Sequence, residues 1–334
     1  MGVELEELKA WILLMRPNGL AVVGREDQVN GILKTSIRNC QQIQNGTENG
    51  NPSDFPQSVL DLINTAAVQQ CNSLDGLSDG LIATPLNCSF NPRALACSSN
   101  ADTMTECLTP FQLSTALGFY NGAIDPITNN QLYPGFVPGS ELTWTGISSI
   151  YEIYTTTLFQ NTWANNLSYD PLADFSFFGS DLAKVHDGLG VFINANNPDL
   201  SKFHARGGKL ILSQSMADNI NPQKFPLDYY TRIKEALHMS NDEIDSWFRL
   251  FHVPGASHCG GGPGPNFFDP IPQLVQWVED PSNQPSAPDR IIATKFNNDT
   301  FSGGLNRTMP LCPWPKAAIY VGGNVDVASS SECR

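Results

Sequence analysis

One stretch, 207–264, constrains the fold of this 334-residue chain more than any other. It opens with two glycines and a short apolar run at 209–212, which is typical of a buried strand. Apolar residues at helical spacing follow in 226–237, behind a proline suited to a first helical turn. A second apolar run at 248–253 is strand-like and ends in a proline and a glycine. The order strand, helix, strand predicts a β-α-β unit of a parallel sheet.

Two side chains with catalytic potential follow the two predicted strands. Asp218 closes the first, and His258 lies in a glycine-rich loop after the second. Loops at the carboxyl ends of neighbouring parallel strands share one crevice, so we expect the two side chains to meet. An Asp bonded to one imidazole nitrogen leaves the other to accept a proton, and the order Asp, His ends the Ser, Asp, His series of α/β-hydrolases. The residues alone leave open the alternative that Asp218 only caps a turn and that His258 has only a structural role.

The segments around these residues resemble the feruloyl esterase and tannase family of secreted serine esterases. The resemblance rests on ARGGKLIL, VPGASHCGGGPG, LVQWVE and APDRIIAT, and covers about residues 55–334. It implies a Cys-Ser-x-Gly-Gly nucleophile motif whose Cys is bonded to the Cys beside the catalytic His, and that second Cys is Cys259 here. One departure is Ser215, where the family has Gly three residues before the Asp.

The predicted fold class is α/β: an α/β-hydrolase-type parallel sheet, incomplete, with an inserted lid domain. We expect most aromatic side chains of the lid to form its core and the others to meet a phenolic ring. The aromatic set is Tyr133, Phe136, Trp144, Tyr151, Tyr154, Phe159 and Trp163. Four regions are expected: an atypical N-terminal segment at 1–54, a helix and calcium loop at 55–87, the lid at 88–185, and the C-terminal part of the hydrolase core at 186–334.

By resemblance, the parent activity is hydrolysis of carboxylic esters of phenolic acids, with His258 as general base then acid and Asp218 as its orienting partner. The nucleophile is unknown, because the sequence contains no Cys-Ser-x-Gly-Gly and no serine in a recognisable nucleophile turn. Removing a triad nucleophile costs on the order of 10⁶ in turnover, so we expect an inactive, N-terminally truncated member. The alternative is a secreted, calcium-binding pseudoenzyme that binds phenolic or polysaccharide ligands. A substitute serine within 1–100 and the choice between feruloyl and tannin esters also stay open.

The loop after the first predicted helix has the composition of a calcium site. Its oxygen donors are the side chains of Asn72, Asp75 and Asp79 and the carbonyls of Leu77 and Leu81. Ca²⁺ takes about six to eight such ligands, but two Asp-Gly turns on a solvated surface would look the same. The resemblance implies a calcium ion of structural role here, with Asp in place of Asn72, so we expect weakened affinity.

The eight cysteines contain no Cys-x-x-Cys pair, which favours disulfides over a zinc site. The resemblance implies the pairs Cys71 with Cys88, Cys97 with Cys107, and Cys312 with Cys333. Cys40 and Cys259 stay unassigned: they either pair with each other or leave Cys259 as a free thiol.

Secretion is expected from the cysteines, the resemblance and five Asn-x-Ser/Thr sequons. The sequons begin at Asn45, Asn87, Asn166, Asn298 and Asn306. The start MGVELEELKAWILLM does not resemble a signal peptide, and no apolar run approaches the roughly 18 residues that span a bilayer. With 19 basic and 33 acidic residues, the chain would repel nucleic acid and anionic membranes. The oligomeric state stays open.

Overall fold

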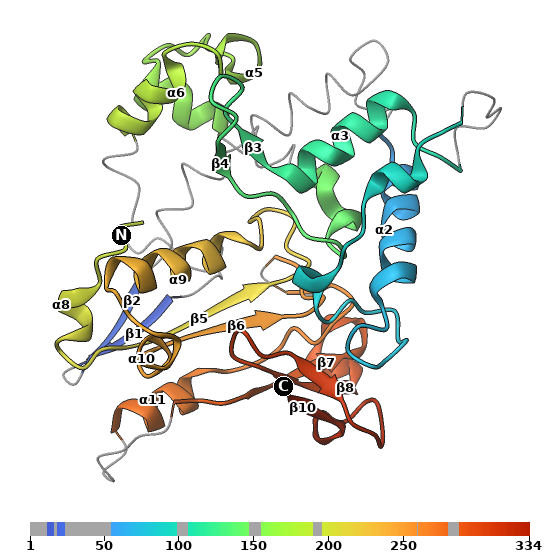
Figure 1. Cartoon of the computed structure of the whole chain (residues 1–334), viewed down its shortest axis with the longest axis vertical. Coiled ribbons are helices and arrows are strands. Elements are labelled where there is room, and N and C mark those ends of the chain that lie inside the picture. The colour runs from blue at the N-terminus through green and yellow to red at the C-terminus, as the bar shows by residue number, and fades with distance from the viewer. Residues whose placement is uncertain are drawn as a thin grey trace.

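The centre of the molecule is a four-stranded sheet in the order β2-β1-β5-β6, flanked by helices (Figure 1). The structure is a computed structural model. It describes residues 12–16, 19–23, 55–98, 106–146, 155–189, 196–258, 260–279 and 287–334.

The predicted β-α-β unit is confirmed. Strands β5 (Lys209–Ser215) and β6 (Phe248–Val253) pair in parallel. Helices α9 (Phe225–Ala236) and α10 (Asn241–Asp245) form the crossover between them, and a capping box at Ser240 starts α10. The two strands therefore end at the same edge of the sheet, which is the edge that the Asp and His loops leave.

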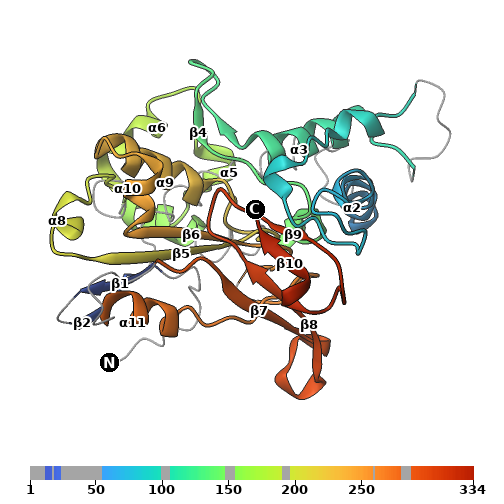
Figure 2. The same ribbon diagram turned by 60° about the horizontal axis from the view of Figure 1, so that its bottom comes forward.

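The two faces of this unit follow the two-residue period of a strand. Leu210 of β5 packs in one cluster with Ile233 of α9, whereas its neighbour Ile211 packs in another with Leu274 of helix α11 (Ile271–Glu279). Figure 2 shows α9 and α10 on one side of β5 and β6 and α11 on the other. Both faces of the two strands are buried, which explains their near-continuous apolar sequence.

The prediction of a parallel sheet is wrong for one edge. Strands β1 (Ile12–Arg16) and β2 (Gly19–Val23) pair antiparallel, and β1 also runs antiparallel to β5. The sheet is therefore mixed, and the atypical segment 1–54 supplies two of its strands. Only two residues separate β1 from β2, and so short a connection allows only antiparallel pairing. The brief apolar run near the start of the printed sequence has the length of a strand.

Helix α2 (Gln57–Cys71) has the predicted apolar stripe, and its buried residues include Leu60, Ile63 and Ala67. A 3₁₀ turn at Pro85–Asn87 leads from α2 into the segment predicted as the lid, which we call the lid below. Its elements are α3 (Pro110–Asn121), β3 (Ala123–Ile124), β4 (Gln131–Tyr133), α5 (Pro171–Asp174), α6 (Asp181–Lys184), 3₁₀ turns at Pro92–Leu95 and Glu141–Gly146, and π turns at Phe159–Trp163 and, at its end, Val185–Leu189. Helix α8 (Ser201–His204) then leads back to β5.

Aromatic side chains fill the lid, as predicted. Trp144 and Phe119 stack with ring centroids 4.5 Å apart, and Phe136 packs against both. Buried members of the predicted set are Tyr133, Phe136, Trp144 and Phe159, and Trp163 packs on Phe159. Tyr151 and Tyr154 lie outside the described residues.

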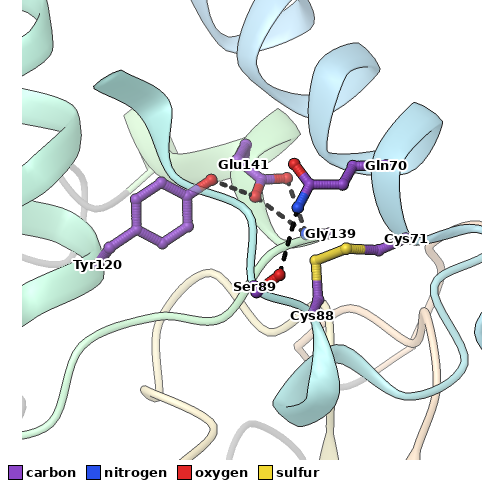
Figure 3. The surroundings of a disulfide bond; sticks show 7 residues. All are labelled: Gln70, Cys71, Cys88, Ser89, Tyr120, Gly139 and Glu141. Atoms are coloured by element: carbon purple, nitrogen blue, oxygen red, sulfur yellow. Dashed lines mark hydrogen bonds between the residues drawn. A yellow bond between two sulfur atoms is a disulfide. The ribbon is translucent and has the colours of Figure 1, made fainter. Parts of the chain in front are cut away.

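A buried carboxylate fastens the lid to α2. Glu141 is 0 % exposed and accepts hydrogen bonds from Asn64 Nδ2 (2.8 Å), Tyr120 Oη (2.6 Å) and the amide of Gly139 (2.9 Å to either oxygen). Figure 3 shows Glu141 with Tyr120 and Gly139, near the disulfide that joins Cys71 to Cys88. Burial raises the pKa of Glu141, and these hydrogen bonds oppose the rise.

The C-terminal part forms separate two-stranded sheets. Strand β7 (Ile291–Phe296) pairs antiparallel with β8 (Leu305–Leu311) and does not join the central sheet. Strands β9 (Ala318–Tyr320) and β10 (Ser331–Cys333) pair with each other. Short 3₁₀ turns lie at Asn297–Asp299, Phe301–Gly303 and Ala328–Ser330.

The structure contains the three disulfides that the resemblance implies. Cys71 is bonded to Cys88, Cys97 to Cys107, and Cys312 to Cys333. Three disulfides are typical of a protein that folds in an oxidising compartment. Cys40 and Cys259, the unassigned pair, lie outside the described residues. Within the parts of the chain that are described, no helix combines the length and the apolar character needed to cross a membrane.

Candidate active site

The loops after β5 and β6 bring Asp218 and His258 into contact. Backbone bonds extend the pairing of the strands beyond their ends, from Met216 N to the Val253 carbonyl and from Ala217 N to the Ala256 carbonyl, each 2.9 Å. Oδ2 of Asp218 then lies 3.1 Å from Nδ1 of His258. The carboxylate is 2 % exposed, and the imidazole is partly exposed at the edge of the sheet.

The Asp218 carboxylate is surrounded by donors. Its Oδ1 accepts from the amides of Ile220 (2.8 Å) and Asn221 (2.9 Å), as in an Asx turn. Its Oδ2 accepts from the side chains of Asn221 (3.2 Å) and Gln214 (3.4 Å) in addition to facing His258. Fixed donors on both oxygens hold the carboxylate in one orientation, so the imidazole meets an acceptor that is already in place.

Two amide side chains that the sequence analysis missed complete the surroundings. Asn221 is buried, and its Nδ2 lies 3.1 Å from His258 Nδ1 as well as beside Asp218. Gln223 donates to the Asp218 carbonyl and accepts from the amide of Val137 (3.0 Å), which joins the Asp loop to the base of the lid. The signal that could have found them is a concentration of amides in the short segment between the strand and α9.

The glycines after His258 fold its loop back on itself. The amide of Ser257 donates to the Gly261 carbonyl (3.0 Å), and that of Gly264 to the Gly255 carbonyl (3.1 Å). A Cβ at Gly262 would lie 2.3 Å from the Gly255 carbonyl oxygen, too close for any other residue, and its φ of +91° also favours glycine. The glycine run therefore allows the two arms of the loop to approach closely, and this close approach fixes the position of His258. Cys259 is outside the described residues.

The outer side of this loop is held by β7. Lys295 donates to the Gly262 carbonyl and forms an ion pair with Asp299. Asp299 also accepts from Asn266 Nδ2 at 3.0 Å. These contacts tie the turn between β7 and β8 to the His258 loop.

A cavity of about 150 Å³ lies between the lid base, the loop after α2 and the loops that carry Asp218 and His258. Its lining includes Asn64, Val68, Ile82, Leu142, Met216 and Gly255. Met216 is two residues from Asp218, and Gly255 begins the loop of His258. The cavity therefore adjoins the Asp and His loops on the side that faces the lid.

The predicted calcium loop closes largely on itself. Oδ1 of Asn72 accepts from the Gly80 amide (2.9 Å), Oδ1 of Asp75 from Leu77 (3.1 Å), and Oδ1 of Asp79 from Leu81 (3.1 Å). Gly76 and Gly80 have φ of +91° and +85°, which provides the sharp turns. Across the described ranges, no point gathers three or more His, Cys, Asp or Glu side chains.

The two carboxylates of this loop, those of Asp75 and Asp79, have different surroundings. Asp79 Oδ2 forms an ion pair with Arg307 Nη1 at 2.6 Å. Asp75 is 3 % exposed, and burial raises the pKa of its carboxyl, with the nearby charge of Asp79 adding to the rise. A buried carboxylate beside a second one is an environment in which a cation would be favourable.

The same loop contains a serine motif that the sequence analysis overlooked. Gly76-Leu77-Ser78-Asp79-Gly80 has the form Gly-x-Ser-x-Gly. A nucleophile elbow requires a turn between a strand and a helix, whereas Ser78 is exposed in a loop that follows helix α2. The motif therefore lacks the structural context of a nucleophile.

Comparisons with known proteins identify a family over most of the chain. A family model described as tannase and feruloyl esterase matches residues 38–334. An uncharacterized esterase of Xanthomonas campestris is 31% identical over an alignment of 317 positions, which covers 82% of this chain and 54% of that protein. Mono(2-hydroxyethyl) terephthalate hydrolase of Piscinibacter sakaiensis is 30% identical, over 84% of this chain and 52% of its own length.

Solved structures show the same relationship. Feruloyl esterase B from Aspergillus oryzae superposes with a TM-score of 0.77 at 26% identity, over 92% of this chain and 62% of that one. An esterase from the same organism superposes with a TM-score of 0.80 at 25% identity, again over 92% and 62%. The chain spans about half the length of the curated relatives it matches.

Proposed function

The chain belongs to the tannase and feruloyl esterase family, and we propose that Asp218 and His258 are the acid–base pair of a carboxylic ester hydrolase. The observation that carries the proposal is the 3.1 Å contact between Asp218 Oδ2 and His258 Nδ1, made by loops at the ends of two adjacent parallel strands. The geometry matches the roles of the second and third members of a hydrolase triad.

In the proposed mechanism, His258 transfers protons through Nε2. With Nδ1 held by Asp218, Nε2 takes the proton of the attacking hydroxyl and later returns it to the leaving alcohol. The Asp218 carboxylate stabilises the imidazolium that forms between these two steps. The donors from Ile220, Asn221 and Gln214 keep that carboxylate in place, so little reorganisation is needed when charge develops.

The proposed substrates are esters of phenolic acids. A feruloyl esterase supports this class by name, and a second relative is named for the hydrolysis of a terephthalate ester, which is aromatic but not phenolic. We further propose that the 334 residues alone do not turn such esters over, because they contain no Cys-Ser-x-Gly-Gly motif.

The test uses the chain alone and the chain supplemented in trans. Methyl ferulate hydrolysis is measured first with the chain and its His258→Ala variant, then with the segment of feruloyl esterase B that this chain does not cover added by co-expression. We expect no difference between the variants alone, and activity in the complemented protein that His258→Ala abolishes. Complemented activity that survives His258→Ala would refute the acid–base role.

Two other outcomes separate the alternatives. His258-dependent hydrolysis by the chain alone would mean that one of its own serines is the nucleophile, and a fluorophosphonate probe would label it. Binding of methyl ferulate without hydrolysis, in both the chain and the complemented protein, would favour a pseudoenzyme. Isothermal titration with the ester detects such binding.

A structural calcium ion in the loop at 72–81 is a second part of the proposal. The oxygen donors of Asn72, Asp75 and Asp79 fit Ca²⁺, and the burial of Asp75 beside a second carboxylate, with Arg307 paired to one of the two, supports a cation there. The ion would hold the loop in its folded form. We expect millimolar Ca²⁺ to raise the melting temperature of chelator-treated protein, Asp75→Asn to remove that response, and Asn72→Asp to lower the concentration required. An unchanged melting temperature would exclude the ion.

A further inference from the structure

The turn between β7 and β8 is rigidly built and projects from the body of the molecule (Figure 2). The amide of Asn297 donates to the Gly304 carbonyl (3.0 Å), and its side chain donates to the Gly303 carbonyl (3.0 Å). The next residue, Asn298, has a φ of +57° and is exposed. Asn298 thus lies at the tip of a turn whose two ends are fixed.

An organised group of phenylalanines surrounds this tip. The rings of Phe267, Phe296 and Phe301 contact one another, with centroids 4.8 to 5.2 Å apart, and we call them the phenylalanine cluster. Phe301 is 73 % exposed, and neighbouring Leu305 is 63 % exposed. Single exposed apolar residues are ordinary, but a packed cluster with its outer ring open to solvent indicates a surface that something covers.

The sequence supplies a covering group at the same place. Asn298-Asp299-Thr300 is an N-glycosylation sequon, with Phe296 two residues before the Asn and Phe301 three residues after it. We propose that Asn298 carries an N-linked glycan whose first sugars lie on the phenylalanine cluster. A pyranose ring has an apolar face of C–H groups, and packing it on an exposed aromatic ring removes apolar area from water.

The attachment is a group transfer with a defined balance. The side-chain amide nitrogen of Asn298 gives up one proton and bonds to C1 of the first sugar, while the polyprenyl diphosphate that carried the glycan leaves. The donor is the lipid-linked oligosaccharide of a secretory compartment, so the inference rests on the proposed secretion that the three disulfides support. It is independent of ester hydrolysis.

The other described sequons lack this combination. Asn166 Oδ1 accepts from the Ser168 amide (2.9 Å), and Asn306 Nδ2 donates to Asn297 Oδ1 (3.0 Å), where it helps to hold the turn. Asn87 is followed by Cys88, which is disulfide-bonded. The Asn residues of all four described sequons are exposed, and Asn298 differs from the others by the phenylalanine cluster beside it.

Occupancy is tested on the full chain secreted from insect cells behind a cleavable leader. Peptide N-glycosidase treatment in ¹⁸O water marks each modified Asn by conversion to labelled Asp. Trypsin leaves Asn298 and Asn306 in the same peptide, 296–307, but chymotryptic cleavage after Phe301 separates them. We expect most copies to be labelled at Asn298, Thr300→Ser to keep the label, and Thr300→Ala to lose it. An unmodified Asn298 overturns the proposal, whatever the state of the other sequons.

Packing of the sugar on the cluster needs a separate test. Asn298→Gln is compared in the unaltered background and with Phe301→Ala, which keeps the sequon. We expect loss of the glycan to lower the melting temperature by about 2 °C in the unaltered background and by less with F301A. The same four proteins made without glycosylation in oxidising bacterial cells should show no coupling between the two positions. Equal losses in both secreted backgrounds overturn the packing and leave occupancy to the first experiment.

Discussion

Two buried carboxylates, Asp218 in the active-site loops and Glu141 at the lid base, are held in similar ways but have different partners. Each is almost inaccessible to solvent, and each accepts several hydrogen bonds in place of a cation. All the partners of Glu141 are neutral donors, from α2, α3 and its own turn. Asp218 has neutral donors as well, but one oxygen faces His258, a titratable ring at the edge of the sheet.

The difference separates the structural use of a buried charge at Glu141 from the catalytic use that we propose for Asp218. Donors on three segments make Glu141 a clamp between the lid and α2. Moving any one segment would leave a buried polar group without its hydrogen-bond partner. At Asp218 the fixed donors instead hold an acceptor ready for a partner that can gain and lose a proton. We therefore expect changes at Asp218 to affect turnover and changes at Glu141 to affect stability.

The largest effect is expected for Asp218→Asn in the complemented enzyme. An amide keeps the shape and the acceptor for the backbone donors, but it presents the wrong group to His258, so turnover of methyl ferulate should fall about 10⁴-fold. Because the new amide nitrogen replaces an oxygen that accepts from Asn221 and Gln214, some stability should be lost as well, and turnover is therefore compared per folded molecule. Glu141→Gln is the matched control, and its turnover per folded molecule should stay close to that of the unaltered protein. A fall of less than tenfold for Asp218→Asn would contradict the assigned role.

The next largest effect is expected for Glu141→Leu, on stability. Asn64, Tyr120 and Gly139 would lose their common acceptor in a buried site, and each stranded donor costs about 1–3 kcal/mol. We expect the free energy of unfolding to fall by about 4 kcal/mol, as measured by urea denaturation. Glu141→Gln keeps one acceptor oxygen and should lose about half as much. A loss below about 1 kcal/mol for Glu141→Leu would show that Glu141 does not fasten the lid to α2.

Tyr120→Phe is expected to have a smaller effect on the same clamp. It removes the 2.6 Å hydrogen bond to Glu141 but keeps the ring, which packs edge-on against Trp144. A hydrogen bond to a charged group contributes about 1.5–3 kcal/mol, so we expect a loss near 2 kcal/mol. A double-mutant cycle with Glu141→Gln should show clear coupling. Additive losses would mean that the two side chains act independently.

The smallest effect is the pH dependence of the clamp. Burial raises the pKa of Glu141 above its unfolded value of 4.5, so the folded protein binds this proton more tightly than the unfolded chain. The free energy of unfolding should therefore increase as the pH falls through the folded-state pKa of Glu141, and the increase should level off below about pH 4.5. Subtracting the unfolding curve of Glu141→Gln isolates this term. If the difference in unfolding free energy between the unaltered protein and Glu141→Gln shrinks on acidification, the pKa of Glu141 is lowered in the folded protein and the prediction is wrong.

Local patterns were sufficient wherever an element carries its own signal. The helix at α2 and the strands at β5 and β6 follow from apolar spacing, and the order of those strands brought Asp218 and His258 to one edge. The apolar run of β1 was visible too, but nothing nearby indicated a partner. Its place beside β5 depends on which edge of the assembled sheet is still open for strand pairing.

The sequence by itself determined the strand–helix–strand unit and the two residues that leave its edge, because strand and helix periods are properties of neighbouring residues. Only the tertiary structure decided which side chains surround them. The contact of Asn221 with both members of the pair, the link from Gln223 to Val137 and the three-segment clamp on Glu141 all join parts that meet only after folding. Hydrogen bonds between distant segments leave no spacing in the sequence, since their geometry is set by how the elements pack.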